Sequence, residues 1–417
     1  MHAVIMGAGI AGVTNAYFLA KAGFKVTVVD RQPEAARETS FANAGMIAPG
    51  HSFTWNSPGA PMTLLKSLFG AKTALRLKLS TDPRFYSWGL KFLRNCTAAR
   101  AHEKTLVKLS LNLYSQQQTH KVVAETGVAY DGMRNGILYL YRNAEMLEAG
   151  VAHMQMMRDR GLRIDVLDAE GCARVEPTLA AVKRRIAGAI HCPDDESGDA
   201  CKFTQGLAAA CQRMGVEFRY NTTVREIIVG GGRVGGVVTD KGMVKGDTYV
   251  MSLGSYSSLL SKNLGVKLPV YPVKGYSLTL PIDGHNGAPS LPTVDEENLV
   301  AISRLGDRMR MTAIAEFSGY DNSNKPEDFA GMIAAAKDLY PDSCDFGKPN
   351  YWSCLRPMTP DGPPVVGRGK QKNMFFNTGH GHMGWTMACG TGRITADLMQ
   401  DKKPEIDVTG MLVDRFN

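Results

Sequence analysis

The first thirty residues combine two short apolar runs with one segment of helical period. Residues 3–6 (AVIM) form an apolar run of strand length, and residues 25–30 (KVTVVD) form a second run that ends at Asp30. Between them, residues 11–22 carry apolar side chains at helical spacing, and Gly23 marks the end of that segment. A strand, a helix and a strand in this order predict a βαβ unit with parallel strands.

Later segments show the same mixture of periods. We predict helices over 101–126, 203–214 and 326–340, strands within 215–252, and a strand pair over 268–281. Near the C-terminal end, residues 373–379 (NMFFNTG) form a strand that leads through a glycine-rich turn into a helix over 387–399. A second strand–glycine–helix unit so far from the first predicts a nucleotide-binding domain assembled from distant segments, with another domain inserted between them.

Length and composition describe an ordinary globular chain of two domains. Its 417 residues exceed what one hydrophobic core usually supports, and 44% hydrophobic with 21% charged residues is typical of a water-soluble protein. No apolar run approaches the roughly 18 to 20 residues that cross a bilayer. The first strand begins next to Met1, which leaves no room for a signal peptide. We therefore expect a cytoplasmic protein.

Charge and cysteine spacing narrow the choice of partners. The net charge is +8, but the basic residues are scattered and form no nucleic-acid motif, so we expect no nucleic-acid partner. A basic surface suits anionic substrates or an anionic membrane surface. The eight cysteines contain no C-x-x-C pair, which favours reduced thiols and predicts no metal site.

A glycine motif lies between the first strand and the first helix. Gly7, Gly9 and Gly12 spell G-x-G-x-x-G, and Asp30 ends the second strand 23 positions after Gly7. Glycines at this spacing let a pyrophosphate approach the backbone at a helix N-terminus, and the acidic residue can bind ribose hydroxyls. The sequence therefore predicts a dinucleotide site, although the motif alone does not separate FAD from NAD.

Other segments resemble a known family. Residues 39–50 (TSFANAGMIAPG), 352–364 (WSCLRPMTPDGPP) and 377–388 (NTGHGHMGWTMA) are similar to the D-amino acid dehydrogenase small-subunit family, within the FAD-dependent glycine and D-amino acid oxidase superfamily. Residues 188–208 and 272–281 extend the resemblance over nearly the whole chain. The resemblance implies a bacterial flavoprotein of amino-acid catabolism with FAD as its cofactor.

The resemblance also implies the fold. We expect an α/β protein in which a Rossmann-like FAD-binding domain is formed by residues 1–50, 198–255 and 350–417. An α+β substrate domain with a mixed or antiparallel sheet is expected over residues 51–197 and 256–349. Carried over position by position, the implied FAD-binding residues are Gly7, Ala8, Gly9, Ile10, Ala11, Gly12, Asp30, Arg31, Ser40, Asn43, Ala44, Gly45, Met46, Val224, Gly254, Gly379, His380, Gly381, His382, Met383, Gly384, Trp385 and Thr386.

Three residues are implied at the substrate. Arg356, in an LRP motif, matches the family position that binds the substrate carboxylate. The structural alternative is a partly exposed arginine in a salt bridge. Tyr276 is predicted to share the carboxylate or close the pocket, with an aromatic packed in a strand as the alternative. His51 follows the flavin loop, and His380 and His382 lie in the C-terminal glycine turn; for each of them a structural role is favoured over a catalytic one. Relatives often differ at His51 and His382, which leaves the substrate preference open.

The implied reaction is oxidation of a small D-amino acid such as D-alanine, D-proline or D-hydroxyproline, by hydride transfer from Cα to flavin N5. We expect a quinone or a protein to accept the electrons, which suits peripheral attachment to the cytoplasmic face of the inner membrane and either a homo- or a hetero-oligomer. An oxygen-using glycine- or sarcosine-type amine oxidase and a non-catalytic flavoprotein subunit are the alternatives. Cys354 resembles the position of covalent flavin attachment in sarcosine oxidases, whereas the dehydrogenase pattern implies non-covalent FAD.

Overall fold

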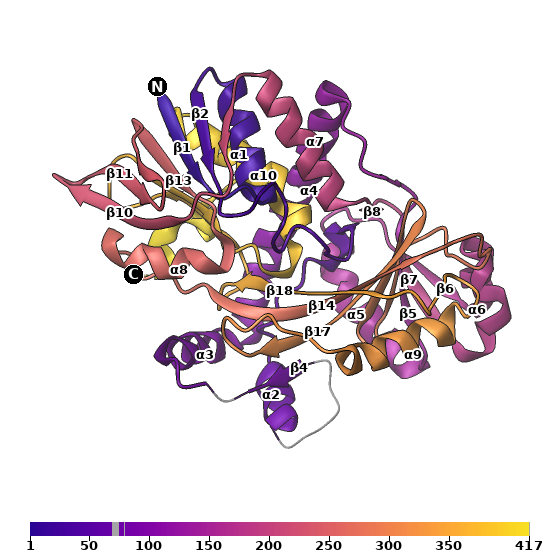
Figure 1. Cartoon of the computed structure of the whole chain (residues 1–417). Helices are drawn as coiled ribbons and strands as arrows, with labels where there is room; N and C mark the ends of the chain where they lie inside the picture. Colours follow the sequence, from indigo (N-terminus) through magenta and orange to yellow (C-terminus); the bar gives the residue numbers. More distant parts are fainter. Residues whose placement is uncertain (69–74, 79, 417) are drawn as a thin grey trace.

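A computed structural model describes residues 1–68, 75–78 and 80–416. One sheet, called here the N-terminal sheet, contains the first strand of the chain at its centre (Figure 1). Its strands are parallel except for the pair at one edge. In order across the sheet they are β19 (Val365–Arg368), β20 (Met374–Thr378), β13 (Thr248–Met251), β1 (His2–Met6), β2 (Lys25–Val29) and β9 (Glu217–Arg219).

The predicted βαβ unit is confirmed. β1 and β2 run parallel on either side of α1 (Ile10–Lys21) in the chain, and their inward apolar residues form one core with that helix. α7 (Ala200–Arg213) and α10 (Gly384–Met399) join the same core. α7 begins three residues earlier than predicted because the Asp199 carboxylate accepts hydrogen bonds from the backbone N–H groups of Cys201 and Lys202 and caps the helix.

A second and larger sheet, called here the large sheet, carries the predicted mixed pairing. Its strands are antiparallel except where β15 meets β5 and where β4 meets β17. In order it contains β18 (Asn350–Met358), β14 (Tyr271–Pro281), β17 (Arg308–Phe317), β16 (Val300–Leu305), β15 (Thr293–Asp295), β5 (Ile137–Tyr141), β7 (Gly188–Cys192) and β6 (Asp165–Asp168), with β4 (Leu75–Leu77) beside β17.

Helices cover both faces of the large sheet. α9 (Ala330–Leu339) packs on one face and α5 (Ala144–Arg158) on the other (Figure 1). The remaining elements are α2 (Ala60–Leu68), α3 (Pro83–Asn95), α4 (Ala98–Thr126), α6 (Ala169–Val175), α8 (Ser257–Leu260), β3 (Met46–Ile47), β8 (Glu196–Ser197), β10 (Val224–Gly230), β11 (Arg233–Thr239), β12 (Gly242–Val244), η1 (Pro49–His51), η2 (Pro177–Arg185), η3 (Gly254–Tyr256), η4 (Ser261–Leu264), η5 (Pro326–Phe329), η6 (Gly381–Met383), η7 (Thr409–Met411) and η8 (Val413–Phe416).

Some elements differ from the sequence prediction. The predicted strand pair over 268–281 is one long strand, β14, because its residues pair with β17 on one side and β18 on the other. β18 lies in the large sheet although the predicted boundary assigns residues 350–417 to the cofactor domain. α4 packs on α10 and thus on the N-terminal unit, although its residues fall in the predicted substrate domain. Periodicity identifies such elements but does not say which sheet or helix they join.

None of the described helices combines the length and apolar character that a membrane span requires.

Candidate active site

One cavity of about 940 Å³ reaches from the N-terminal sheet to the large sheet. Gly7, at the end of β1, lies on its wall together with Arg356, on β18. Most of the exposed wall surface is apolar, and polar and charged side chains are distributed among the aromatic and aliphatic ones. A cavity of this size, lined in this way and placed between two units, is typical of a small-molecule or cofactor site.

The glycine motif forms one end of the cavity. Gly12 lies against the turn itself, because a Cβ atom at this position would come within 1.8 Å of the Gly7 carbonyl oxygen. Gly9 caps α1 without a side-chain hydrogen bond of its own. The backbone N–H of Ile10 donates to the Ser40 hydroxyl at 3.0 Å, and the N–H of the next residue, Ala11, lies at the cavity. Such a terminus attracts an anionic group through its free N–H groups and its dipole.

Asp30 lies beside this turn, as predicted from its place after β2. Its carboxylate accepts hydrogen bonds from the backbone N–H groups of Ala8 (2.5 Å) and Gln32 (2.8 Å). Burial nevertheless raises the pKa of Asp30, because removing a carboxylate from water disfavours its charged form. The remaining capacity of the carboxylate suits the hydroxyl groups of a ribose.

Arg31 and Tyr256 border the same end of the cavity. The Arg31 guanidinium carbon lies 4.0 Å from the centre of the Tyr256 ring, and its Nη2 lies 2.6 Å from a Glu38 carboxylate oxygen. Val224 also lines this part of the wall. A flat aromatic and cationic surface of this kind can stack against a planar base.

Most of the predicted cofactor residues meet at this cavity, and three lie behind its wall. Ala8, Gly12 and Gly379 support the turns without lining the cavity. The predicted residues that line it are Gly7, Gly9, Ile10, Ala11, Asp30, Arg31, Ser40, Asn43, Ala44, Gly45, Met46, Val224, Gly254, His380, Gly381, His382, Met383, Gly384, Trp385 and Thr386.

The C-terminal glycine turn brings a second helix N-terminus to the cavity. α10 begins at Gly384 without a side-chain cap, and Thr386 in its first turn accepts a hydrogen bond from the backbone N–H of Ala48 at 3.2 Å. His380 pairs with Met358 in an isolated bridge, which joins this turn to the end of β18. The strand that carries Arg356 and the turn that carries His382 therefore lie side by side.

Arg356 projects into the cavity without an acidic partner. Among the described residues, no carboxylate lies within ion-pair distance of its guanidinium, and its Nη1 donates to the Ile314 carbonyl oxygen at 2.8 Å. Burial lowers the pKa of Arg356, since no anion offsets the loss of water. A buried cation that lacks a counter-ion is costly, so its environment is suited to an anionic ligand.

Two backbone features hold this guanidinium in place. It lies over Gly275 on β14, where a Cβ atom would come within 2.4 Å of the Arg356 Cζ atom. The carbonyl group that it contacts belongs to Ile314, a β-branched residue at φ +63° in an irregular step of the β14–β17 pairing. A β-branched residue rarely adopts this conformation, and such strain often accompanies a functional site.

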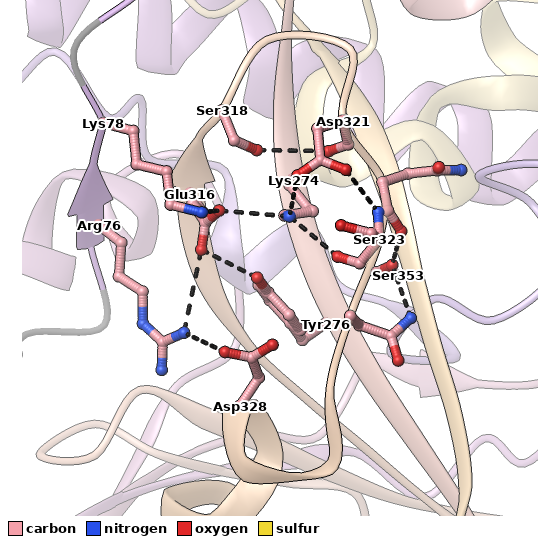
Figure 2. Close-up of polar contacts among 12 residues, drawn as sticks. Arg76, Lys78, Lys274, Tyr276, Glu316, Ser318, Asp321, Ser323, Asp328 and Ser353 are labelled. Carbon is pink, nitrogen blue, oxygen red and sulfur yellow. Dashed lines mark hydrogen bonds and ion pairs between the residues drawn. The ribbon is translucent and has the colours of Figure 1, made fainter.

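Tyr276 does not point its hydroxyl group at Arg356. It follows Gly275 on β14, so its side chain lies on the opposite face of the strand, and its hydroxyl donates to Glu316 at 2.9 Å (Figure 2). Its ring packs against Phe329 in the core beneath α9. Tyr276 also lines the cavity, but its hydroxyl group is engaged by Glu316, so this geometry favours the alternative of an aromatic packed in a strand over the predicted contact with a substrate carboxylate.

Tyr276 belongs to a buried charge network on that face. Lys274 and Glu316 are each 2% exposed and lie 3.2 Å apart, and Lys78 of the β4 edge approaches the same carboxylate at 2.8 Å (Figure 2). Burial would raise the pKa of Glu316, but hydrogen bonds from Lys78 and Tyr276 and the charge of Lys274 lower it below its ordinary value. The cation Lys274 is thus fully matched by protein groups.

His51 lies on the cavity wall among other aromatic rings. Its imidazole stacks on Tyr139, with ring centres 5.7 Å apart, and meets His382 edge to face at 5.9 Å. Trp55 stacks on the other side of His382 at 5.0 Å. Burial, with a smaller effect from Lys108, lowers the pKa of His51 to about 4, so the ring is neutral at physiological pH.

Sequence reasoning missed several residues of this site. Gly275 carried a usable signal, because a glycine inside a strand often marks a close approach of another group. Ile314, Trp55 and Tyr139 carried none, since a single apolar residue gives no sign of which wall it joins. Cys354 lies on the wall beside Arg356, and burial raises the pKa of its thiol.

The residues present fit a flavin dinucleotide. Two helix N-termini without side-chain caps open on one cavity, and a glycine turn and an acidic residue lie at the end that suits a nucleotide. Among the described residues, no group of three or more His, Cys, Asp or Glu side chains could hold a metal ion. The fold and the cavity therefore define the architecture of a dinucleotide-binding protein.

Comparisons with known proteins give the family. The model of the family described as FAD dependent oxidoreductase matches residues 2–398. The chain belongs to this family, and FAD is the cofactor that the family uses. The D-amino acid dehydrogenase of Bradyrhizobium diazoefficiens is 45% identical over 416 residues, which cover 100% of this chain and 99% of that protein. D-amino acid dehydrogenase 2 of Mesorhizobium japonicum is 43% identical and covers 99% of both chains.

Solved structures share the fold at low sequence identity. Glycine oxidase from Geobacillus kaustophilus matches with a TM-score of 0.75 at 21% identity, over 99% of this chain and 97% of that one. L-proline dehydrogenase from P. horikoshii matches with a TM-score of 0.74 at 19% identity, over 100% of this chain and 97% of that one. These likenesses confirm the predicted α/β fold class.

Proposed function

We propose that this protein oxidises a small D-amino acid at its α-carbon. Full-length relatives at 43–45% identity carry the name D-amino acid dehydrogenase, which supports the choice of substrate. When FAD is bound, its isoalloxazine supplies the hydride acceptor. The protein's own groups bind the substrate, orient its α-carbon and exclude water from the cavity.

One observation carries the proposal. Arg356 is a buried guanidinium on the cavity wall that no described carboxylate neutralises. An amino acid supplies the missing anion, and a planar guanidinium binds a carboxylate through two parallel hydrogen bonds. Gly275 leaves the space that the guanidinium occupies, and the Ile314 carbonyl fixes its orientation. The carboxylate would then set the distance between the α-carbon and the flavin.

Anaerobic reduction of the bound flavin tests this function. The purified protein, loaded with FAD, is mixed without oxygen with a panel of D- and L-amino acids, and the flavin absorbance is followed by stopped flow. We expect bleaching by small D-amino acids and none by their L-enantiomers. Bleaching by L-amino acids alone, or by none of the panel, would contradict the proposal.

Acid precipitation of the FAD-loaded protein separates covalent from non-covalent FAD, and we expect a colourless pellet.

We infer that a quinone or a partner protein accepts the electrons, through peripheral contact with a membrane surface. Exposed apolar side chains support this inference: Met62 and Leu65 on α2, and Tyr86, Leu90 and Leu93 on α3. Both helices lie beside β4 at one end of the molecule (Figure 1). Apolar side chains exposed together on amphipathic helices suit a lipid interface.

Two measurements test this inference. With substrate and a soluble quinone, an oxygen electrode should record little oxygen consumption while the quinone is reduced. Rapid oxygen consumption would instead identify an oxidase. Sedimentation with anionic vesicles should carry the protein into the pellet, and Leu65→Ser with Leu90→Ser should release it.

A further inference from the structure

The substrate end of the cavity contains two histidines, His51 and His382. Among the described residues, neither imidazole ring exchanges a hydrogen bond with another side chain or backbone group, although the backbone N–H of His51 donates to the Ala48 carbonyl oxygen, and Nε2 of His382 is buried without a partner. Buried polar atoms are almost always paired in folded proteins, so a ring pair left open needs an explanation. A ligand that occupies the cavity can supply the missing partner.

Packing fixes both rings in position. Tyr139 stacks on His51, and its hydroxyl donates to Asp195, which also accepts from the backbone N–H of Gly50 at 3.0 Å. Trp55 covers His382. Rings that each stack on an aromatic neighbour and meet edge to face lose little further freedom when they bind a ligand, so their hydrogen bonds are preorganised.

The histidine pair lies close to the predicted carboxylate anchor. His380 and Met358 form the bridge that joins the glycine turn to β18, and His382 and Arg356 each stand two positions from that bridge. Burial is the main cause of the low pKa of His382, and the positive charges of Lys108 and, to a smaller extent, Arg356 lower it further. A group a few bonds from a carboxylate bound at Arg356 can therefore reach the pair.

The electrostatics of this corner favour a neutral partner. Both rings are neutral, so each offers one N–H donor and one acceptor nitrogen. A cationic side chain would be repelled by Arg356, and burial raises the pKa of Glu296, which also lines the cavity, to about 7, so this carboxyl group is no fixed counter-charge at neutral pH. A second carboxylate would find no adjacent cation on this wall, because Lys108 donates to the Phe53 carbonyl oxygen at 2.7 Å and does not line the cavity. A hydroxyl group, which both donates and accepts, matches two neutral imidazoles.

We propose that His382 and His51 form a subsite for a hydroxyl group on the substrate side chain, so that hydroxylated D-amino acids are preferred over their apolar counterparts. The proposal rests on the proposed function and specifies the substrate class within it. His382 and His51 are specificity residues here, and the chemistry at the α-carbon does not require them.

Matched substrate pairs test the subsite. The FAD-loaded enzyme is assayed with D-threonine against D-valine, D-serine against D-alanine, and cis-4-hydroxy-D-proline against D-proline. We expect kcat/KM to favour the hydroxylated member of at least one pair by about tenfold, the effect of one net hydrogen bond. Preference for the apolar member in all three pairs would overturn the proposal.

Variants assign the preference to the rings. His382→Leu should lower kcat/KM for the hydroxylated member about tenfold more than for its apolar counterpart, and His51→Phe should act in the same direction. His382→Asn, which keeps a donor and an acceptor, should restore part of the preference. His153→Leu is a matched control, because this exposed histidine stacks on Phe53 at the rim of the same cavity and should leave the ratio unchanged.

The outcomes separate this inference from the function on which it rests. If D-alanine bleaches the flavin but His382→Leu and His51→Phe both leave every ratio unchanged, the subsite is wrong and the D-amino acid function stands. If His382→Leu lowers kcat/KM equally for both members of each pair, the ring contacts the common amine or carboxylate and the subsite is again wrong. If no D-amino acid reduces the flavin, the function itself fails. FAD content, measured by absorbance for each variant, shows that the fold persists, and a variant that loses FAD is replaced by the other histidine variant.

Discussion

The two faces of β14 each carry a buried cation, but only one of these cations has acidic partners. On one face, Lys274 is matched by Glu316 and Asp321, and Tyr276 completes the network (Figure 2). On the other face, above Gly275, the Arg356 guanidinium has a carbonyl oxygen but no described carboxylate. A cation that is neutralised inside the protein stabilises the fold, whereas one left unmatched can bind an external anion. The neutralised Lys274 therefore has a structural role, whereas the unmatched Arg356 is available to bind a ligand.

Removal of the unmatched cation should have the largest effect. Arg356→Ala should lower kcat/KM by about 10³-fold, because truncation of one partner of a buried charge pair costs roughly 2 to 5 kcal/mol. The FAD content and the melting temperature should change little, since no described carboxylate loses its partner. Steady-state kinetics with a dye acceptor measure the effect, and unchanged kinetics would remove Arg356 from the substrate site.

Removal of the matching anion should mainly lower stability. Glu316→Gln leaves Lys274 buried without its nearest carboxylate, and we expect the free energy of unfolding to fall by about 3 kcal/mol. Urea unfolding followed by tryptophan fluorescence measures this loss. The double variant Lys274→Met with Glu316→Leu is the control, and it should be less destabilised than Glu316→Gln. If the double variant were less stable than Glu316→Gln, the interpretation of Lys274 and Glu316 as a matched structural pair would be contradicted.

The same carboxylate should give a defined pH dependence. The pKa of Glu316 is lower in the folded protein than its ordinary value of 4.5. Its contribution to stability is therefore fully present above that value and is lost as the pH falls through the folded pKa. Glu316→Gln should flatten this part of the acid unfolding curve, and an identical acid curve for the variant would contradict the assignment.

Gly275→Ala should produce a smaller loss of function. The new Cβ atom would overlap the Arg356 guanidinium, so the side chain must shift away from its place above the strand. We expect KM for the amino acid to rise about tenfold, since misplacement weakens a bidentate contact without removing the charge. Titration of the flavin spectrum with a carboxylate ligand such as benzoate should show a parallel loss, and an unchanged affinity would contradict the placement.

Tyr276→Phe should have the smallest effect, and it distinguishes a structural role of Tyr276 from a role in substrate binding. Loss of its hydrogen bond to Glu316 should lower the free energy of unfolding by about 1 kcal/mol. KM should stay within about twofold of the wild-type value, because the hydroxyl group does not face Arg356. A tenfold rise in KM without a loss of stability would return Tyr276 to the substrate site.

The sequence predicted the elements whose signals are local. The βαβ unit, the G-x-G-x-x-G turn and the acidic residue at the end of β2 all lie within thirty residues, where periodicity and glycine spacing are informative. The LRP segment was predicted by resemblance alone, and its role stays a prediction until Arg356 is tested. The two readings of Tyr276, a substrate contact or an aromatic packed in a strand, stayed open, because the sequence gives no register for β14 between its two neighbours.

The sequence by itself determined the fold family, the cofactor class and the set of candidate residues, since each depends on short motifs in fixed order. Only the tertiary structure decided that Arg356 lies over Gly275 and meets the carbonyl of Ile314, 42 positions away. It also decided that His382 contacts the rings of His51 and Trp55 on one wall of the cavity, although His382 lies more than 300 positions from both in the chain. Strand register, one irregular step in β17 and the bridge between β18 and the glycine turn produce these contacts, and none of them leaves a pattern in a single sequence.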